Sequence, residues 1–253
     1  MDKIHKELNE RIDKTYLKNN GYSQYLKKKN NNYKNYVFNG EEQDKTNKYQ
    51  MLTEFVNYFN ATMKSPISDL IIGFVKTKRI CQNCRAGYYS FSNYLYIVFD
   101  LSDKDNDTDF DLIYDGFKQK HKTPKCIGTD GPDKIWCEKC QIYPEFKEFN
   151  RYYTLNNHLI IVFIRGKNYQ NRSKIIFQEN INLKDYIEED INYPKIFKLV
   201  GSINRKVLNN KEEYVPYFKD PNDLNNWRTK GFQQIQSDPN EQIIMLFYNS
   251  DEY

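Results

Sequence analysis

The sequence predicts an α+β fold in which a helical N-terminal part is followed by a mostly antiparallel β part. The helical prediction comes from residues 48–63, where apolar side chains recur at helical spacing, at Met51, Leu52, Phe55, Val56 and Phe59. After about residue 70, short runs rich in β-branched and aromatic residues alternate with polar turns, a pattern typical of strands. Aromatic residues make up 16% of the chain, which favours a packed aromatic core over disorder.

The β part is expected to contain seven main runs. We expect the acidic stretch Asp103–Asp111 to form a loop tip that leads into a short helix near Leu112–Lys118. The expected strands are Leu70–Val75, Tyr94–Leu101, His158–Ile164, Lys174–Phe177, Phe197–Ile203, Tyr214–Phe218 and Ile243–Tyr248.

The first 47 residues form a separate region in this interpretation. Residues 1–18 are expected to be helical, because Ile4, Leu8 and Ile12 recur at helical spacing between charged residues. Residues 19–47 are rich in Asn and Lys, and we expect an irregular connection or a partner-binding arm. The predicted domain organisation is therefore an N-terminal helix and polar arm over 1–47 and a folded domain over 48–253.

Charge and hydropathy exclude several classes of protein. The net charge is only +4, a balance that does not by itself favour a nucleic-acid partner. An RNA-binding zinc protein is an alternative that depends on Lys27-Lys28-Lys29, but such charge runs are usually solvated surface. No apolar stretch reaches the length of a membrane span, and the charged N-terminus does not resemble a secretory signal. The expected location is the cytoplasm or the nucleus.

Two CxxC pairs are the strongest local signal in the sequence. Cys81 and Cys84 form the first pair, and Cys137 and Cys140 form the second. Each pair can lie on a tight turn and offer two thiolates to one tetrahedral metal ion. Zinc suits four sulfur ligands, and with no coordination position left for water the ion would be structural rather than catalytic.

Disulfides and a redox-active CxxC are the alternatives at these cysteines. Disulfides are disfavoured because no secretory signal is present, and a redox CxxC normally lies in a βαβ unit. The fifth cysteine, Cys126, lies in a turn-rich segment and is expected to be an unreactive thiol.

The cysteine pairs lie inside a longer ordered pattern that covers about four-fifths of the chain. Its parts include Tyr49-Gln50 with Glu54-Phe55, the segment KTKRICQNC, the strand YLYIVFDL, the segment KIWCEKCQ and the strand HLIIVFIRG. They continue with Lys174–Phe177, Phe197–Ile203, Tyr214–Lys219, Trp227 and Met245–Tyr248. In order and spacing this pattern resembles the ubiquitin-specific protease family, the papain-like deubiquitinases.

The resemblance implies a papain-like fold with fingers, a palm and a reduced helical thumb, and with zinc held by the four cysteines in the fingers. Within the domain, it implies a residual thumb helix over residues 48–80, a zinc-containing fingers region over 81–157 and a palm over 158–253.

The same resemblance implies that the catalytic residues are missing. Cysteine hydrolases need a thiolate, an imidazole and a group that orients the imidazole. The chain has no cysteine before Cys81, whereas the family's nucleophile lies in an N-terminal box. Glu213 takes the place of the family's histidine, and no acid follows Trp227 in the segment WRTKGF. The three histidines are elsewhere, at His5, His121 and His158.

These observations predict a non-catalytic ubiquitin-specific-protease-like module that binds proteins or acts as a scaffold subunit of a larger complex. Ubiquitin is one possible partner under this hypothesis, and no membrane partner is expected. The alternative is a ubiquitin thiol hydrolase whose nucleophile segment is supplied elsewhere.

Overall fold

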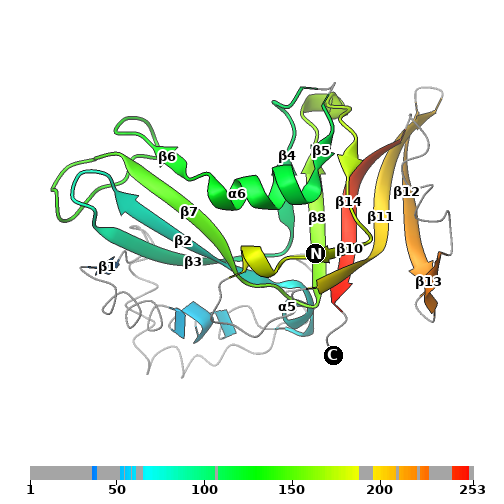
Figure 1. Ribbon diagram of the computed structural model, residues 1–253, viewed down its shortest axis with the longest axis horizontal. Helices are drawn as coiled ribbons and strands as arrows, with labels where there is room; N and C mark the ends of the chain where they lie inside the picture. The colour runs from blue at the N-terminus through cyan, green and yellow to red at the C-terminus, as the bar shows by residue number, and fades with distance from the viewer. Residues whose placement is uncertain are drawn as a thin grey trace. The chain divides into compact units, whose positions relative to one another are not determined.

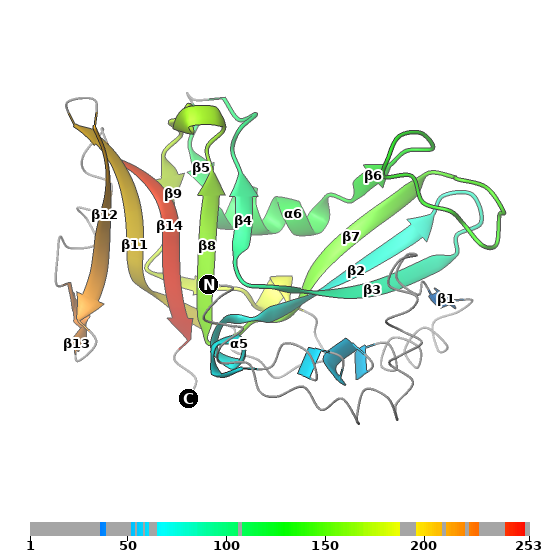
Figure 2. The same cartoon turned by 180° about the vertical axis from the view of Figure 1, so that it is seen from behind.

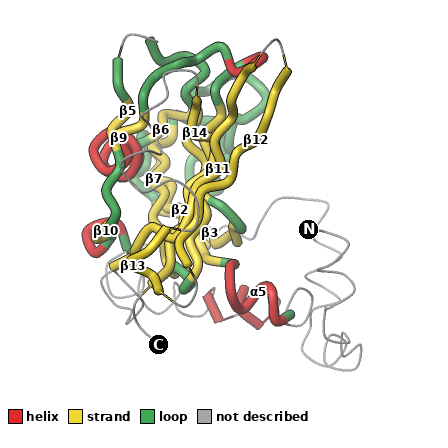
Figure 3. Tube along the Cα trace, turned by 90° about the vertical axis from the view of Figure 1, so that its right-hand side faces the viewer, coloured by secondary structure: helices red, strands yellow, loops and turns green. Residues whose placement is uncertain are grey.

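A computed structural model describes residues 36–38, 52–53, 55–57, 59–60, 65–105, 108–187, 196–208, 211–220, 223–227 and 241–250. The helix predicted for residues 1–18 lies outside these residues, as does most of the connection predicted for 19–47. Strands make up most of the described chain, as the yellow segments in Figure 3 show. Among the described residues, no helix has the length and apolar character that a membrane span requires.

The described elements are, in chain order, β1 Tyr36–Phe38, α5 Pro66–Ile71, β2 Gly73–Cys81, β3 Gly87–Tyr94, β4 Ile97–Asp100, β5 Phe110–Asp111, η2 Leu112–Lys118, α6 Gln119–Lys122, β6 Lys125–Ile127, β7 Phe146–Thr154, β8 His158–Ile164, η3 Lys167–Tyr169, β9 Ile175–Ile176, β10 Asn180–Asn182, η4 Lys184–Tyr186, β11 Ile196–Leu208, β12 Lys211–Asp220, β13 Asp223–Trp227 and β14 Glu241–Ser250.

The chain divides into two compact units. The first, which we call the cysteine unit, comprises Met1–Leu70, Phe74–Asn93 and His121–Tyr153. The second, which we call the sheet unit, comprises Ile71–Gly73, Tyr94–Lys120 and Thr154–Tyr253. The domain boundaries expected from the sequence stay a prediction.

The cysteine unit is built on a five-stranded sheet in the order β1-β3-β2-β7-β6. Strands β2 and β7 are rich in charged and polar residues, and polar pairs join them. Arg79 Nε donates to Glu148 Oε2 at 2.7 Å, and Thr77 Oγ1 donates to Asn150 Oδ1 at 2.6 Å. Such cross-strand polar pairs add to the stability of a sheet alongside its apolar contacts. Neither strand was predicted over its full length from the sequence.

Aromatic side chains fill the apolar part of the cysteine unit. Residues 52–53, 55–57 and 59–60 are helical, which confirms the helix predicted for 48–63 in its described part. Phe55 and Phe59 contact Phe74 edge to face, with ring centroids 5.3 and 5.2 Å apart. Phe91 continues this cluster toward Tyr153 at 5.4 Å. The apolar spacing of the helix therefore has the packing role that the sequence indicates.

The sheet unit is built on a seven-stranded sheet in the order β13-β12-β11-β14-β8-β4, with β10 paired to β11. Figures 1 and 2 show β11, β14 and β8 side by side at its centre. Neighbouring strands are antiparallel except for β4, which runs parallel to β8. The largest fully buried side chains of the unit include Tyr217, Tyr248, Phe197, Ile161 and Phe117. Alternate residues of the central strands therefore form its core.

Helical structure over Leu112–Lys118 confirms the short helix predicted there, and Gln119–Lys122 continues it. The Oδ1 atom of Asp111 accepts hydrogen bonds from the backbone of Ile113 and Tyr114, both at 2.8 Å, which caps the helix N-terminus. A Cβ atom at Gly116 would lie 3.0 Å from the Phe99 ring, so a larger residue there would require the ring to shift by a few tenths of an ångström.

Several strand boundaries differ from the prediction. The run Leu70–Val75 is not one strand, because α5 ends at Ile71 and β2 begins at Gly73. Ser65 and Ser68 cap each other's backbone N–H groups at the start of α5, a local signal for a helix. The predicted strand Tyr94–Leu101 is also divided, between the end of β3 and β4.

Candidate functional site

The first CxxC pair lies on a tight turn between β2 and β3. The backbone N–H of Cys81 donates to Ala86 O at 3.0 Å, and the N–H of Arg85 donates to Cys81 O at 3.0 Å. Arg85 has a positive φ of 60°, which lets the turn close. This backbone geometry turns the side chains of Cys81 and Cys84 toward the same point.

The second CxxC pair repeats this geometry. The N–H of Cys137 donates to Ile142 O at 2.9 Å, and the N–H of Gln141 donates to Cys137 O at 2.8 Å. Gln141 has a φ of 55°, and it occupies the position in its turn that Arg85 occupies in the first. The N–H of Gln82 donates to Glu145 O at 2.9 Å and so ties the first turn to the segment that leads from the second turn into β7.

The four sulfur atoms converge. The Sγ atoms of Cys81, Cys84, Cys137 and Cys140 all lie within 4.8 Å of one another. Cys81 and Cys140 are 3.8 Å apart, and Cys84 and Cys137 are 3.6 Å apart. Four sulfurs placed tetrahedrally at about 2.3 Å from zinc would be about 3.8 Å apart, so the observed spacing fits a tetrahedral ion.

This geometry also decides against disulfides as the role of the cysteines. A disulfide requires sulfurs about 2.05 Å apart, whereas all five cysteines here are free. The four clustered cysteines could therefore hold one metal ion, as the sequence predicted. Cys81 and Cys137 are completely buried, so an ion at this site would be shielded from water on the side of the protein core.

The thiols of the cluster differ in their proton affinity. Burial raises the pKa of Cys81, and desolvation with hydrogen bonds among the neighbouring thiols raises the pKa of Cys140 to about 12. At Cys137 burial acts in the same direction, but hydrogen bonds from Tyr88, the Cys140 backbone and the other thiols outweigh it and lower the pKa to about 6. A bound cation would displace the remaining protons, so metal binding at this site would release protons.

Two side chains next to the sulfurs were not identified from the sequence. The Tyr88 hydroxyl lies 3.2 Å from Cys137 Sγ, and Asn83 Nδ2 donates to Cys140 Sγ at 3.4 Å. Asn83 lies within the first CxxC pair, so its proximity could have been expected. Tyr88 gives no such signal, because the pattern of β3 shows only that its ring faces the core.

The fifth cysteine lies apart from the cluster in the same unit. Cys126 is exposed on β6, and its cross-strand partner on β7 is Lys147. His121 is buried beside Tyr152 with ring centroids 5.2 Å apart, and His158 begins β8 opposite Asn249. His5 lies outside the described residues.

Glu213, the residue that the sequence resemblance puts at the family's histidine position, lies in β12 near the β11–β12 hairpin. Its side chain is exposed, and its cross-strand partner is Lys206. The neighbouring Glu212 accepts a hydrogen bond from Arg205 Nη2 at 2.6 Å. That hydrogen bond lowers the pKa of Glu212 below its ordinary value of 4.5. The residues after Trp227, where the orienting group would lie, are outside the described residues.

The loop after β8 contacts the same hairpin. The guanidinium of Arg205 lies over the Tyr169 ring at 4.5 Å, and the Tyr169 hydroxyl lies 3.3 Å from the Tyr214 hydroxyl. The base of this loop is held by Arg165, which is 2% exposed. Its guanidinium donates to the carbonyls of Ile243, Asn171 and Ser173 at 2.9, 3.3 and 2.9 Å.

Comparisons with known proteins place the fold. No family model and no curated protein matches the sequence. Several solved structures do match. One is the yeast SAGA DUB module with a mutant Sgf73, which is 17% identical and has a TM-score of 0.56; the match covers 78% of this chain and 45% of the matched chain. The SAGA Ubp8/Sgf11/Sus1/Sgf73 DUB module bound to ubiquitin aldehyde matches at 16% identity and a TM-score of 0.56. This match covers 81% of this chain and 48% of the matched chain.

A further match is the SAGA DUB module bound to monoubiquitin, at 17% identity and a TM-score of 0.55, covering 81% of this chain and 47% of that one. The chain thus spans about half the length of the structures it matches. At this level of identity the likeness concerns the fold. It confirms the α+β, ubiquitin-specific-protease-like fold predicted from the sequence.

Proposed function

We propose that this chain is a non-catalytic, ubiquitin-specific-protease-like module that acts as a protein-binding or scaffold subunit of a larger complex. The fold supports this, because the structures it matches are modules assembled from several proteins, two of them solved with ubiquitin or ubiquitin aldehyde bound. Fold alone does not carry function to this chain. The residues at the two sites therefore carry the proposal.

The ion that we propose for the four cysteines is zinc, in a structural role. Zinc prefers tetrahedral sulfur coordination, and four protein ligands leave no coordination position for a reactive water. The buried side chains around Cys81 and Cys137 would then depend on the ion for their packing. Zinc would contribute to the folding of the cysteine unit rather than to chemistry.

The observation that carries the non-catalytic proposal is the distribution of thiols. Four of the five cysteines converge on one cluster, and Cys126 is exposed opposite Lys147. A cysteine hydrolase needs a thiolate beside a base that can hold its proton. By the sequence resemblance Glu213 takes the histidine position, and a carboxylate is a much weaker base than imidazole for holding a thiol's proton. Cys126 and Glu213 therefore do not provide the nucleophile and the base that a cysteine hydrolase needs.

The hairpin residues also oppose binding of a flexible peptide tail at this place. The family has small residues before its histidine, whereas this chain has Glu212, which pairs with Arg205. Tyr169 and Tyr214 add two further large side chains to the same surface. We propose that any contact with ubiquitin involves its folded surface and not its C-terminal tail.

A ubiquitin derivative with a thiol-reactive C-terminus tests the non-catalytic proposal. We expect no covalent adduct by intact mass spectrometry after prolonged incubation with the full chain, while a working deubiquitinase reacts in the same sample. An adduct would contradict the proposal. Comparison with Cys126→Ser would then show whether Cys126 or a clustered cysteine had reacted.

The scaffold proposal is tested by isolating the chain from its own cells at its natural level. We expect it to elute from size-exclusion chromatography in a complex with stoichiometric protein partners. Elution as a monomer under mild conditions would contradict the scaffold role. A chain lacking residues 1–47 should lose partners if that region is the partner-binding arm.

A further inference from the structure

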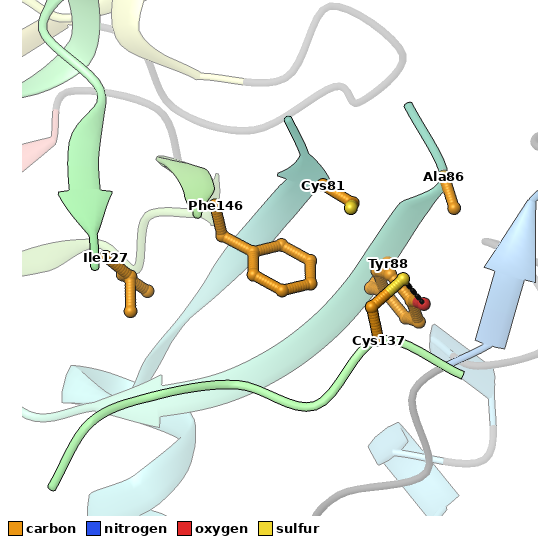
Figure 4. Close-up of a cluster of buried hydrophobic side chains, with 6 residues drawn as sticks. All are labelled: Cys81, Ala86, Tyr88, Ile127, Cys137 and Phe146. Atoms are coloured by element: carbon orange, nitrogen blue, oxygen red, sulfur yellow. Dashed lines mark hydrogen bonds between the residues drawn. The ribbon is translucent and has the colours of Figure 1, made fainter. Parts of the chain in front are cut away.

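A tyrosine hydroxyl is directed at one sulfur of the cysteine cluster. Tyr88 lies in β3, 49 residues before Cys137 in sequence, and its hydroxyl is 3.2 Å from Cys137 Sγ. Figure 4 shows the two side chains pointing toward each other, with the contact as a dashed line. The distance is within the range of a hydrogen bond to sulfur.

The position of Tyr88 is fixed by its surroundings. The side chain is 2% exposed, and its ring packs edge to face on Phe146 with centroids 5.7 Å apart. Ala86 and Ile127 complete the same buried cluster. Because the ring is held by packing, little conformational entropy is lost when the hydroxyl engages the sulfur. The contact is therefore preorganised by the fold.

The chemistry of the pair allows one direction for the hydrogen bond once a metal is bound. A cysteine sulfur that ligates a metal is a thiolate, so it carries no proton and can only accept. The Tyr88 hydroxyl must then be the donor. Cys137 is completely buried, so water does not compete with the hydroxyl for this sulfur.

The four sulfurs are not equivalent in their donors. Cys140 is half-buried and receives the exposed amide of Asn83, a contact that solvent can replace. Cys81 receives the backbone N–H of Cys84 at 3.5 Å. Four thiolates around a divalent cation leave a net negative charge at the site. A hydrogen bond to a buried sulfur stabilises this charge more than a hydrogen bond to an exposed sulfur does, because the local dielectric is lower. Tyr88 is the buried side-chain donor of this set.

We propose that Tyr88 is a positioning residue of the metal centre, whose hydroxyl donates to the Cys137 thiolate and raises the retention of the bound ion. This inference depends on the proposed zinc site. Outer-shell hydrogen bonds of this kind typically contribute a factor of about 10 to 100 in metal affinity. The effect would be specific to the hydroxyl, because Phe at this position keeps the ring and its packing.

The test compares Tyr88→Phe with Tyr89→Phe, a matched control. Tyr89 is the next residue in β3, is also buried, and has its ring beside the ammonium groups of Lys76 and Lys78, 5.4 and 5.3 Å away. Zinc affinity is measured for the full chain by competition with a chromophoric chelator, and the thiolate-to-metal absorption band is recorded with cobalt. We expect Tyr88→Phe to bind one zinc with about 10- to 100-fold lower affinity and a shifted cobalt band. Tyr89→Phe should match the unsubstituted chain.

Equal affinity and an unshifted band in Tyr88→Phe would overturn the inference while leaving the zinc site intact. Failure of the unsubstituted chain to bind zinc or cobalt would instead overturn the proposed zinc site itself. If Tyr88→Phe does not fold, the unsubstituted chain loaded with ¹¹³Cd provides the test by NMR. We expect a slowly exchanging hydroxyl proton with scalar coupling to the metal, and its absence would contradict the inference.

Discussion

The cysteine unit and the sheet unit are stabilised by different means. In the sheet unit, long strands bury large apolar side chains, and Phe197, Leu199 and Leu246 are fully inaccessible. In the cysteine unit, β2 and β7 are joined partly by charged and polar pairs, and four buried or half-buried sulfurs form one end of the core. The ion proposed for the four cysteines would give the cysteine unit stability that the sheet unit obtains from hydrophobic burial.

Removal of the metal should have the largest effect, and it should be confined to the cysteine unit. A chelator that strips zinc should destabilise this unit by several kcal/mol, because a structural zinc contributes on the order of 10 kcal/mol to folding. Hydrogen exchange should become fast around Tyr88 and Phe146, while β11 and β14 stay protected. If the amides around Tyr88 stay protected from exchange after zinc is removed, the packing of the cysteine unit does not depend on the metal. Cys126→Ser is the control and should retain zinc.

Truncation of a core side chain should destabilise the sheet unit and leave the metal in place. Leu246 is completely buried in β14, so Leu246→Ala should lower the free energy of unfolding of this unit by about 2–5 kcal/mol. Chemical denaturation measures the loss, and zinc content per chain should not change. The control is Ile164→Ala, since Ile164 is 44% exposed and its truncation should cost under about 0.5 kcal/mol. Loss of zinc in Leu246→Ala would show that the two units are not independent in stability.

A buried carboxylate in the sheet unit provides a smaller test. The side chain of Glu241 is 1% exposed, and its Oε2 accepts from Tyr217 at 2.6 Å and from Asn204 at 3.2 Å. Tyr217→Phe should destabilise the unit by about 1–3 kcal/mol, because a hydrogen bond to a buried charged group is lost. Tyr214→Phe, at a residue that is 51% exposed, should change the free energy of unfolding by less than about 0.5 kcal/mol. Equal effects of the two changes would contradict a role for the Glu241 contact.

The smallest expected effect concerns the ion pair of Arg205 with the largely exposed side chain of Glu212. The pKa of Glu212 is lowered in the folded chain by the hydrogen bond from Arg205, so the pair stabilises the fold above the ordinary pKa of 4.5. That contribution is lost as the pH falls through the lowered folded pKa. The melting temperature of Glu212→Gln should therefore be slightly below that of the unsubstituted chain at pH 7 and equal to it in acid. A difference that does not change with pH would show that the pair is not the cause.

The sequence predicted the sheet unit better than the cysteine unit, for a physical reason. The run His158–Ile164 coincides with β8, and Ile243–Tyr248 lies within β14, because central strands of a sheet are apolar enough to be recognised. In β2, Lys76 and Lys78 are charged, yet both lie over the ring of Tyr89. Lysine side chains can cover aromatic surface in this way, so the alternation of apolar residues that marks a strand is hidden.

The cluster of four cysteines could be predicted from the sequence, but the residues that surround it could not. Each CxxC spacing is local and reports directly on a turn that presents two thiolates. The contact of Tyr88 with Cys137 depends on how β3 and the second turn pack, which no local pattern encodes. The pairing of Glu212 with Arg205 likewise depends on the register of β11 against β12. The alternative of disulfides is excluded by the free cysteines, while catalysis stays a matter for experiment.

The repeated geometry of the two CxxC turns has a consequence for how the chain folds during synthesis. Each turn is closed by its own backbone hydrogen bonds, so each can form as soon as its few residues leave the ribosome. At about 5–20 residues per second, the second turn follows the first after roughly 3–10 s. During that time the thiols of Cys81 and Cys84 can react with oxidants or bind other metal ions. Binding of the proposed ion after the second turn appears would therefore compete with oxidation of the first pair of thiols.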